Sequence, residues 1–224
     1  SKEKRIFSIN NLKLKKKPYI FFCNEFFDSL PLNQIEKKNN LLYEKRVSYS
    51  NKQFKLQNNL IHDESFNFLS NNEVYEYSPL TNLYLKKIFS HINIFGGGFL
   101  VIDYGPYMKK RISTIQAIFK SKKCDIFDHP FSSDITYHFD FQNIEKYSKK
   151  FNLNFYGPIN QKKFLYFNGI NERINSLINN TQDSDLKIKL SQQFERLTSP
   201  KEMGELFKVV FISKNNFNLP FFER

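Results

Sequence analysis

Short runs of apolar residues along the chain predict the strands of a buried sheet. Two of the runs are continuous, which is typical of strands covered on both faces, as in a parallel sheet between layers of helices. In a third run, alternate residues share one apolar face. The predicted strands are Tyr19–Cys23, Gly98–Asp103, Leu206–Ile212 and a shorter one at Leu153–Tyr156, which ends at Gly157-Pro158.

Helical segments lie between these runs. Ser78-Pro79 is a favourable helix start, with Ser as the cap and Pro in the first turn. The apolar residues that follow repeat at helical spacing until Gly96, which ends the helix. Asp140 can cap a second helix, and Ser199-Pro200-Lys201-Glu202 predicts a helix start with a capping box. The other predicted helices span residues 161–167, 171–179 and 184–197.

Residues 40–75 follow a different pattern. Residues of opposite character alternate from Leu42 to Val47, which is typical of a strand with one face in water. Several short extended pieces here predict a small antiparallel excursion from the main sheet. Since strands and helices alternate elsewhere, the sequence predicts an α/β layer fold with a mainly parallel sheet.

The composition limits the class of protein. The 224 residues are 40% hydrophobic and 25% charged, close to the average of globular chains. The apolar runs are too short to cross a bilayer, so we expect no membrane span. The net charge of +12 would suit a phosphate-rich partner. However, the basic residues are scattered, and the frequent Lys, Asn, Ile, Phe and Tyr are those that A and T alone can encode. We therefore expect no nucleic-acid partner.

Three other patterns predict structure rather than chemistry. Cys23 and Cys124 are isolated, which gives neither a zinc site nor a disulfide framework. The His and Asp residues between Asp125 and Asp140 fit no standard metal spacing, so no metal is expected. The three glycines from Gly96 follow a helix and open a strand, which is the reverse of the order in a nucleotide-binding loop. They predict a helix cap.

The segment from Asn24 to Pro31 carries the most chemistry. It follows a predicted buried strand, so it lies at the C-terminal edge of the sheet, where open α/β sheets bind ligands. Glu25 and Asp28 are three residues apart, and one helical turn would place them on the same side. The alternative is that Asn24 or Asp28 only caps a short helix. Asp103-Tyr104-Gly105 ends another predicted strand in the same way, unless it forms a simple turn.

Seven motifs, in the same order, resemble those of the MidA family. This family comprises S-adenosylmethionine-dependent methyltransferases related to a mitochondrial complex I assembly factor that methylates an arginine. The most specific motif, Asn24-Glu25-Phe26-Phe27-Asp28-Ser29-Leu30-Pro31, resembles the family signature Asn-Glu-Phe-Phe-Asp-Ala-Leu-Pro. The others are Tyr43–Val47, Glu76–Pro79, Gly98–Gly105, Ser113–Ala117, Asp134–Phe141 and Met203–Val209.

The resemblance implies methyl transfer from S-adenosylmethionine to a nitrogen, expected to be that of a protein arginine. A carboxylate holds a guanidinium best, through paired hydrogen bonds. Glu25 is therefore the expected catalytic residue, with Asn24 and Asp28 shaping the site. The residues expected to line the substrate and cofactor pocket are Phe26, Phe27, Asp103, Tyr104, Asp134 and His138.

The family's Glu-x-Gly-x-Gly-x-Gly cofactor loop has no counterpart in this sequence. We therefore expect residues 1–224 to be the C-terminal part of a Rossmann-like class I methyltransferase domain, with the antiparallel excursion at 40–75. This part alone should bind S-adenosylmethionine weakly. It should also leave an apolar sheet edge open at Tyr19–Cys23, unless the excursion folds back over that edge.

The resemblance also implies a protein partner, such as a subunit of respiratory complex I. It places the protein in a bacterial cytoplasm or, in a eukaryote, in the mitochondrial matrix. The sequence leaves a homodimer open. The alternative function is a non-catalytic assembly protein that holds a respiratory subunit without methylating it.

Overall fold

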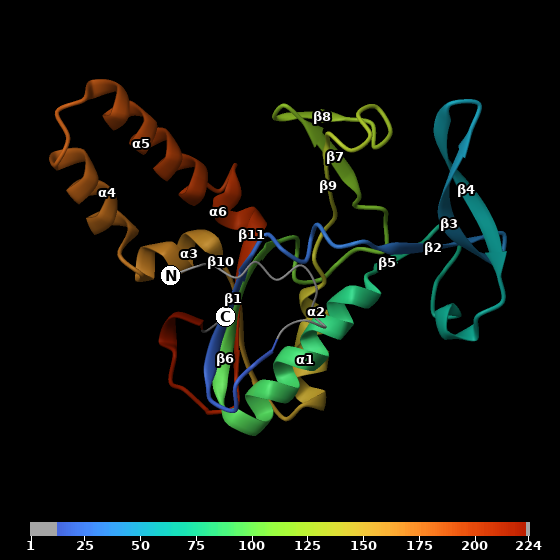
Figure 1. Ribbon diagram of the computed structural model, residues 1–224, viewed down its shortest axis with the longest axis horizontal. Helices are drawn as coiled ribbons and strands as arrows, with labels where there is room; N and C mark the ends of the chain where they lie inside the picture. Colours follow the sequence, from blue (N-terminus) through green and yellow to red (C-terminus); the bar gives the residue numbers. More distant parts are fainter. Residues whose placement is uncertain (1–12, 223–224) are drawn as a thin grey trace.

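The main sheet of the computed structural model, which describes residues 13–222, has four strands (Figure 1). Their order is β1-β6-β11-β10, and their bounds are Tyr19–Asn24, Gly97–Tyr104, Phe207–Ser213 and Asn154–Asn160. Strand β1 pairs with β6 in parallel, whereas β11 is antiparallel to both of its neighbours. Three strands therefore run in one direction and β11 alone is reversed, which confirms a mixed α/β fold. The prediction of a mainly parallel sheet was wrong, because β11 lies between β6 and β10 and makes two of the three strand pairs antiparallel.

Two helices pack on one face of the main sheet and form the largest hydrophobic core with it. Helix α1 (Pro79–Phe95) and helix α2 (Phe141–Lys150) bring their apolar residues onto β6 and β11. Helix α1 begins where predicted, since Ser78 Oγ accepts a hydrogen bond from Thr81 N, and its last turn closes with Gly96 N donating to Ile92 O. The predicted cap role of Gly96 is confirmed.

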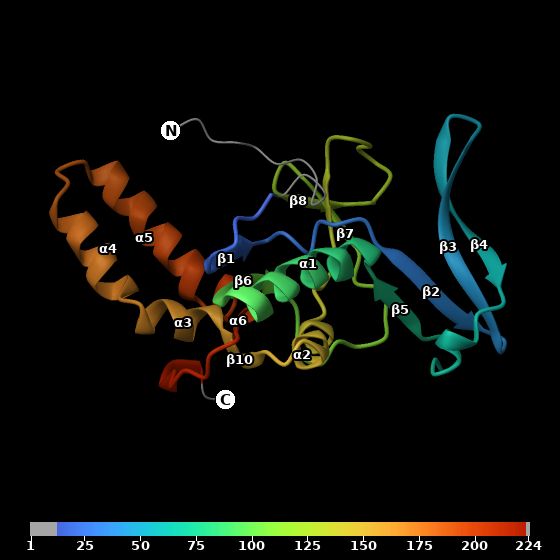
Figure 2. The same ribbon diagram turned by 60° about the horizontal axis from the view of Figure 1, so that its bottom comes forward.

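A second core covers the opposite face. There α3 (Gln161–Phe167), α6 (Met203–Leu206) and the short 3-10 helix η3 (Pro220–Phe222) pack near β6, β10 and β11. Helices α4 (Ile170–Asn179) and α5 (Ser184–Thr198) project from this side, while the antiparallel excursion projects from the opposite end (Figure 2). Helices on both faces of the sheet give the layer arrangement predicted from the sequence.

The excursion is a sheet of its own. It has the order β4-β3-β2-β5 with bounds Gln53–Ile61, Leu41–Ser50, Asn33–Lys38 and Val74–Tyr77, and 3-10 helix η2 (Glu64–Phe66) lies between β4 and β5. It is therefore longer than the predicted 40–75. A third sheet, β8-β7-β9, consists of Lys122–Cys124, Gln116–Phe119 and Asp134–Thr136. In the part of the chain that the structure describes, neither sheet pairs with β1.

Strand β1 is consequently an edge strand of the main sheet. Its side chains alternate in burial, and Ile20 and Phe22 are 69% and 63% exposed. The expectation that this run is buried on both faces was wrong for β1, because Phe21 and Cys23 pack against the core while the face that Ile20 and Phe22 share is largely uncovered by described residues. It holds for β6, which lies between β1 and β11 and is buried along most of its length.

Two predicted boundaries were also wrong. Strand β10 continues through Gly157-Pro158 to Asn160, because a register shift between Tyr156 and Ile159 accommodates the interruption. The Ser199–Glu202 segment forms turns rather than a capped helix start. Helix α6 begins only at Met203, and Glu202 makes no side-chain cap. The remaining predicted helices agree with the structure to within one residue at each end.

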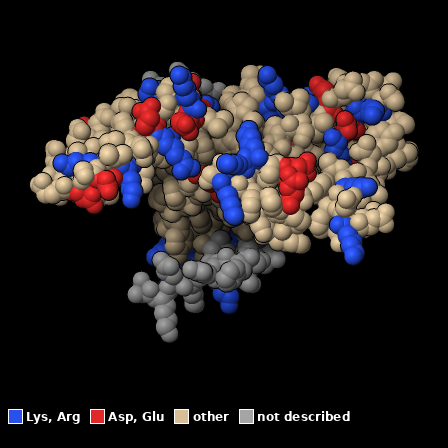
Figure 3. All heavy atoms as spheres, turned by 90° about the horizontal axis from the view of Figure 1, so that it is seen from above, with Lys and Arg blue, Asp and Glu red and all other residues tan. Residues whose placement is uncertain are grey.

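Charged residues are spread over the surface. Figure 3 shows basic side chains across one face of the molecule, interspersed with acidic ones and forming no continuous stripe. On this face, the mixed charges lack the clustered basic surface that is typical of nucleic-acid-binding domains.

We expect Gly97→Ala to destabilise the fold strongly. Gly97 has a φ of +99°, and an added Cβ would lie 2.0 Å from Tyr19 O on the neighbouring strand. The clash and the strained backbone should together lower the free energy of unfolding by more than about 2 kcal/mol. Urea denaturation measures this loss.

Gly169→Ala provides the control. Gly169 also has a positive φ of +80°, but its Cβ would meet only a Glu172 side-chain oxygen at 3.4 Å. The loss there should be about 1 kcal/mol. Equal losses in the two variants would contradict the close approach of β1 and β6.

Candidate functional site

The carboxyl ends of β1 and β6 meet at one edge of the main sheet. The two strands are parallel and Asn24 lies opposite Ile102. One residue further on, Glu25 N donates a hydrogen bond of 2.9 Å to Ile102 O. The segment after β1 therefore lies beside Asp103 and Tyr104, as predicted from the order of the strands.

Asp103 fixes this junction. Its carboxyl group is fully buried, and its two oxygens accept hydrogen bonds from Phe27 N at 3.1 Å and from Tyr104 N at 2.9 Å. One side chain of β6 thus holds the loop that follows β1. Burial, and then the negative charge of Asp28, raise the pKa of Asp103 to about 8.

Asp28 is the second buried carboxyl group of the site. It is 4% exposed, and its Oδ1 has no hydrogen-bond partner among the described residues. Burial, and then the charge of Glu25, raise the pKa of Asp28 to about 6. An unpaired buried carboxylate oxygen is costly unless a donor or a cation meets it. The residues therefore fit a positively charged ligand at this edge.

Glu25 lies at the exposed side of the same cluster. The predicted helical turn is absent: Glu25 has a φ of 49° and is exposed, whereas Asp28 is buried. The two carboxyl groups nevertheless interact, since the charge of Glu25 acts on Asp28. Asn24 Nδ2 donates to Glu25 Oε1 at 3.2 Å and so restrains the Glu25 side chain.

The two aromatic residues of the signature have different places. Phe27 is fully buried in the core and stacks on Phe139, with ring centroids 5.0 Å apart. Phe26 is half-buried and packs edge-on against Tyr84. Only Phe26 can present a ring to a ligand, whereas Phe27 holds the loop in the core.

Tyr104 links the strand ends to the third sheet. Its hydroxyl lies 2.8 Å from Thr136 Oγ1 and accepts a hydrogen bond of 3.0 Å from Gln116 Nε2. The His138 ring packs edge-on against Tyr104, and burial, with a contribution from Lys109, lowers the pKa of His138. Asp134, by contrast, is exposed at the start of β9, and no described contact joins it to the carboxyl cluster.

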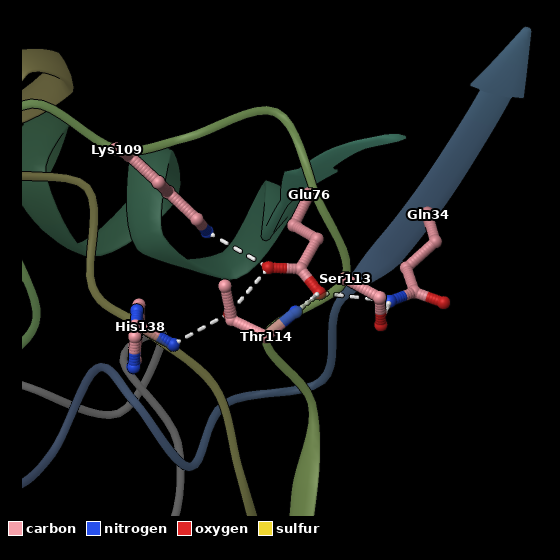
Figure 4. A network of polar contacts seen from close by, with 6 residues as sticks. All are labelled: Gln34, Glu76, Lys109, Ser113, Thr114 and His138. Atoms are coloured by element: carbon pink, nitrogen blue, oxygen red, sulfur yellow. Dashed lines mark hydrogen bonds and ion pairs between the residues drawn. The ribbon is translucent and has the colours of Figure 1, made fainter. Parts of the chain in front are cut away.

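A second buried carboxylate, Glu76, is the centre of a polar network (Figure 4). Glu76 Oε2 lies 3.1 Å from Lys109 Nζ and accepts a hydrogen bond of 2.5 Å from Thr114 Oγ1. Glu76 Oε1 accepts hydrogen bonds from Thr114 N at 2.8 Å and from Gln34 Nε2 at 2.7 Å. His138 N donates to Thr114 Oγ1, which connects this network with the Tyr104 region.

The balance of contacts keeps Glu76 charged. Burial raises its pKa, but the positive charge of Lys109 and the hydrogen bonds from Thr114 and Gln34 outweigh burial and hold the pKa below the usual range. A cavity of about 380 Å³ lies beside Glu76 and is lined also by Lys109 and Asp140.

Sequence reasoning did not single out Glu76, Lys109 or Gln34 as site residues. The signal for Glu76 was present, because it precedes the Ser78 cap of α1 within one of the recognised motifs. Lys109 and Gln34 stand in no motif, and only the folded chain brings them to Glu76.

Two further features are absent from the described part of the chain, a metal-binding cluster and a membrane-spanning helix. Residues 13–222 contain no group of three or more His, Cys, Asp or Glu side chains able to hold a metal ion. Nor does any helix within them have the length and apolar character to cross a membrane.

The described chain is thus a mixed α/β protein with a carboxyl cluster at the ends of two parallel strands. Residues 2–159 match the model of the Methyltransf_28 family, described as "Putative S-adenosyl-L-methionine-dependent methyltransferase". The chain belongs to this family. The resemblance seen in the sequence is thereby confirmed, and so is S-adenosylmethionine as the cofactor of the family.

The curated relatives that the chain resembles have a more specific activity in their names. The chain is 28% identical over 200 residues to the bovine mitochondrial protein arginine methyltransferase NDUFAF7, a match that covers 85% of the chain and 44% of the relative. It is 27% identical to the human protein over the same shares, and 26% identical to the Caenorhabditis elegans homologue, with 84% and 46% covered. The chain thus spans less than half the length of these relatives.

Two crystal structures from Burkholderia thailandensis share the fold. One superposes with a TM-score of 0.78 at 21% identity and covers 95% of this chain and 60% of the other. The second, bound to S-adenosyl-homocysteine, has a TM-score of 0.77 at 22% identity, with 95% and 58% covered. These likenesses confirm the predicted fold class.

Glu76→Ala should destabilise the protein far more than the loss of an exposed ion pair does. It leaves the Lys109 charge buried without its partner, which costs about 3–5 kcal/mol in comparable cases. Urea denaturation at neutral pH measures the loss. Glu73→Ala is the matched control, because Glu73 is only partly buried and pairs at 2.9 Å with Arg111, two residues from Lys109. If both variants lose equally little, the Glu76 network does not support the fold.

Asp28→Asn should flatten the pH dependence of stability. As the pH rises from about 4, the unfolded chain loses the Asp28 proton at its usual pKa of 3.8, while the folded chain keeps it until about 6. The wild-type free energy of unfolding should therefore fall across this window on account of this group. The variant removes that fall and also lowers the pKa of Asp103. Urea denaturation at pH 4, 5, 6, 7 and 8 tests this.

Asp134→Asn removes an exposed carboxyl group and serves as the control for this series. It should keep the wild-type profile. A wild-type profile in Asp28→Asn would mean that the Asp28 carboxyl group titrates normally.

Proposed function

We propose that the protein to which this chain belongs transfers the methyl group of S-adenosylmethionine to an arginine of another protein. The observation that carries the proposal is the carboxyl cluster at the ends of β1 and β6, in which buried Asp28 Oδ1 lacks a hydrogen-bond partner among the described residues. The names of the curated relatives, protein arginine methyltransferases, support the choice of acceptor.

S-adenosylmethionine, when bound, would supply the methyl group of its sulfonium. The S–CH3 bond would break as the N–CH3 bond forms, S-adenosyl-homocysteine would leave, and the nitrogen would release its proton to water. The cluster suits both cations involved, the sulfonium and the guanidinium. Rate acceleration in such a transfer comes mainly from holding the nitrogen in line with the methyl group. The protein's task is therefore to hold and orient a guanidinium.

Glu25 is the group that holds the guanidinium. It is the exposed carboxylate of the cluster, so an acceptor side chain can reach it, and a carboxylate binds a guanidinium through two parallel hydrogen bonds. Asn24 restrains Glu25 through the hydrogen bond between their side chains. Phe26 offers a half-buried aromatic ring beside them, against which the planar guanidinium or its alkyl chain can pack.

Asp28 and Asp103 differ in protonation at neutral pH. Because the pKa of Asp103 is about 8 and that of Asp28 about 6, Asp103 is mostly protonated at neutral pH and Asp28 carries the negative charge. Asp28 can thus compensate a cation at the strand ends, while Asp103 keeps the loop in place through Phe27 N and Tyr104 N. Tyr104 and His138 close the site on the side of the third sheet.

Glu25→Gln should lower methyl transfer by more than about a hundredfold while cofactor affinity changes little. The change preserves shape but removes the charge that pairs with the guanidinium, so it removes contacts made to the acceptor. The assay follows labelled methyl groups from S-adenosylmethionine into proteins of an extract from cells that lack the protein. Calorimetry on the same preparations measures cofactor affinity.

Glu195→Gln, on the projecting helix α5, is the matched control and should transfer methyl groups at the wild-type rate. If Glu25→Gln also keeps that rate, Glu25 is structural. If the wild-type protein transfers no methyl group but still binds a partner protein, a non-catalytic assembly role replaces the proposal.

A further inference from the structure

The hairpin formed by β3 and β4 has two faces of opposite character. Side chains alternate between faces along a strand, and directly paired residues share a face. The pairs Val47–Leu56 and Tyr49–Phe54 therefore lie on one face toward the tip of the hairpin. Nearer its base, the same face carries the pair Lys45–Asn58 and then Tyr43–Leu60. The intervening pairs place polar side chains on the other face, and these are Glu44, Arg46, Ser48, Ser50, Gln53, Lys55, Gln57 and Asn59.

The apolar face is largely uncovered. Val47 and Tyr49 are 60% and 63% exposed, and Leu56 and Leu60 are about half exposed. Near the tip, Phe54 stacks on Phe127, with ring centroids 6.1 Å apart, which turns this face toward the loop after β8. In Figure 1 the hairpin and the β7–β8 arm both rise on the side of the main sheet where β1 and β6 end. Exposed apolar area of this kind marks an interaction surface.

The outer edge of β4 is also open. In the described part of the chain, β4 is the end strand of its sheet and has β3 as its only neighbour. An extended segment of another chain can pair with such an edge through main-chain hydrogen bonds. Every second side chain of that segment would then extend the apolar face.

The charges around this surface indicate the chemistry of the occupant. Residues 41–61 and 116–128, which include Phe127, contain seven basic residues and three acidic ones, Glu44, Asp125 and Asp128. Glu44 already pairs with Arg46 on the polar face, where Lys55 also lies, while Lys52, Lys122 and Lys123 make no ion pair with a described residue. A second copy of this chain would bring two such positive surfaces together, which is unfavourable. An acidic segment is attracted to them.

We propose that the apolar face and the open edge of β4 dock an extended, acidic segment of the methyl-acceptor protein, in which apolar and acidic residues alternate. The identity of the occupant as the acceptor rests on the proposed function. Docking on the hairpin, on the side of the main sheet where β1 ends, would tether the acceptor to the protein through contacts distant from the methylated side chain, which raises its effective concentration at the site.

The test uses two fluorescein-labelled ten-residue peptides, one alternating Val and Glu and the other alternating Val and Lys. Anisotropy titrations with the wild-type chain should show the acidic peptide binding at least about tenfold more tightly than the basic one. Val47→Ser combined with Leu56→Ser should weaken binding of the acidic peptide by about tenfold or more. Gln57→Ser combined with Asn59→Ser, on the polar face, should change it less than about twofold.

Each outcome decides the proposal. Equal binding of the two peptides, or full binding by the Val47→Ser and Leu56→Ser variant, would overturn it. A dimeric wild type that becomes monomeric in that variant, as seen by sedimentation, would make a second copy the occupant and overturn it as well. Circular dichroism checks that the variants, which change exposed side chains only, remain folded.

The peptides contain no arginine, so the docking test is independent of methyl transfer. Glu25→Gln should bind the acidic peptide as the wild type does. Lost peptide binding with normal methyl transfer would contradict only the docking surface. Normal peptide binding without methyl transfer would contradict the proposed function, and with it the identity of the occupant as the acceptor, but not the docking surface itself.

Discussion

The buried negative charge of Glu76 is the constraint on which the arrangement of the site depends. A carboxylate cannot be buried unless hydrogen-bond donors and a cation surround it, and here those groups come from β2, from the loop after β6 and from the segment before β7. Satisfying Glu76 therefore holds the antiparallel sheet, the strand ends of the main sheet and the third sheet in one position. The hydrogen bond from His138 N to Thr114 Oγ1 extends this restraint to the residues beside Tyr104.

The strand ends use buried charge in a different way. Around Glu76 the charge is compensated. At the strand ends, burial and the charge of Glu25 raise the pKa of Asp28, burial and the charge of Asp28 raise the pKa of Asp103, and Asp28 Oδ1 has no donor in the described chain. Burying such groups lowers the stability of the unliganded fold. A bound cation offsets this loss, so the same carboxyl groups favour the liganded state. The compensated network supplies the rigid frame that keeps the uncompensated pair in place.

Much of the fold followed from local sequence signals. The caps at Ser78 and Asp140, the glycine at position 96 and the continuous apolar run of β6 each depend on neighbouring residues, so a single sequence predicts them. The signature after β1 also predicted which carboxyl groups meet at the sheet edge. The predictions that failed, on the exposure of β1 and the end of β10 at Gly157, depend on distant contacts. The partners of Glu76, which the sequence did not indicate, depend on distant contacts as well. The short spacing of Glu25 and Asp28 suggested one shared face, but the loop's attachment to Asp103 buries one residue and exposes the other.

The sequence separation of the Glu76 contacts has a consequence for how the chain acquires its structure. Gln34 lies 42 residues before Glu76, and Thr114 lies 38 residues after it. Contacts this distant form only after long loops have closed, which slows folding relative to helical proteins of similar size. During synthesis, β2 and β5 leave the ribosome before Lys109 does, so Glu76 has no buried cation to meet at that stage. The antiparallel sheet is therefore expected to stay loosely associated with the rest until the segment after β6 has emerged.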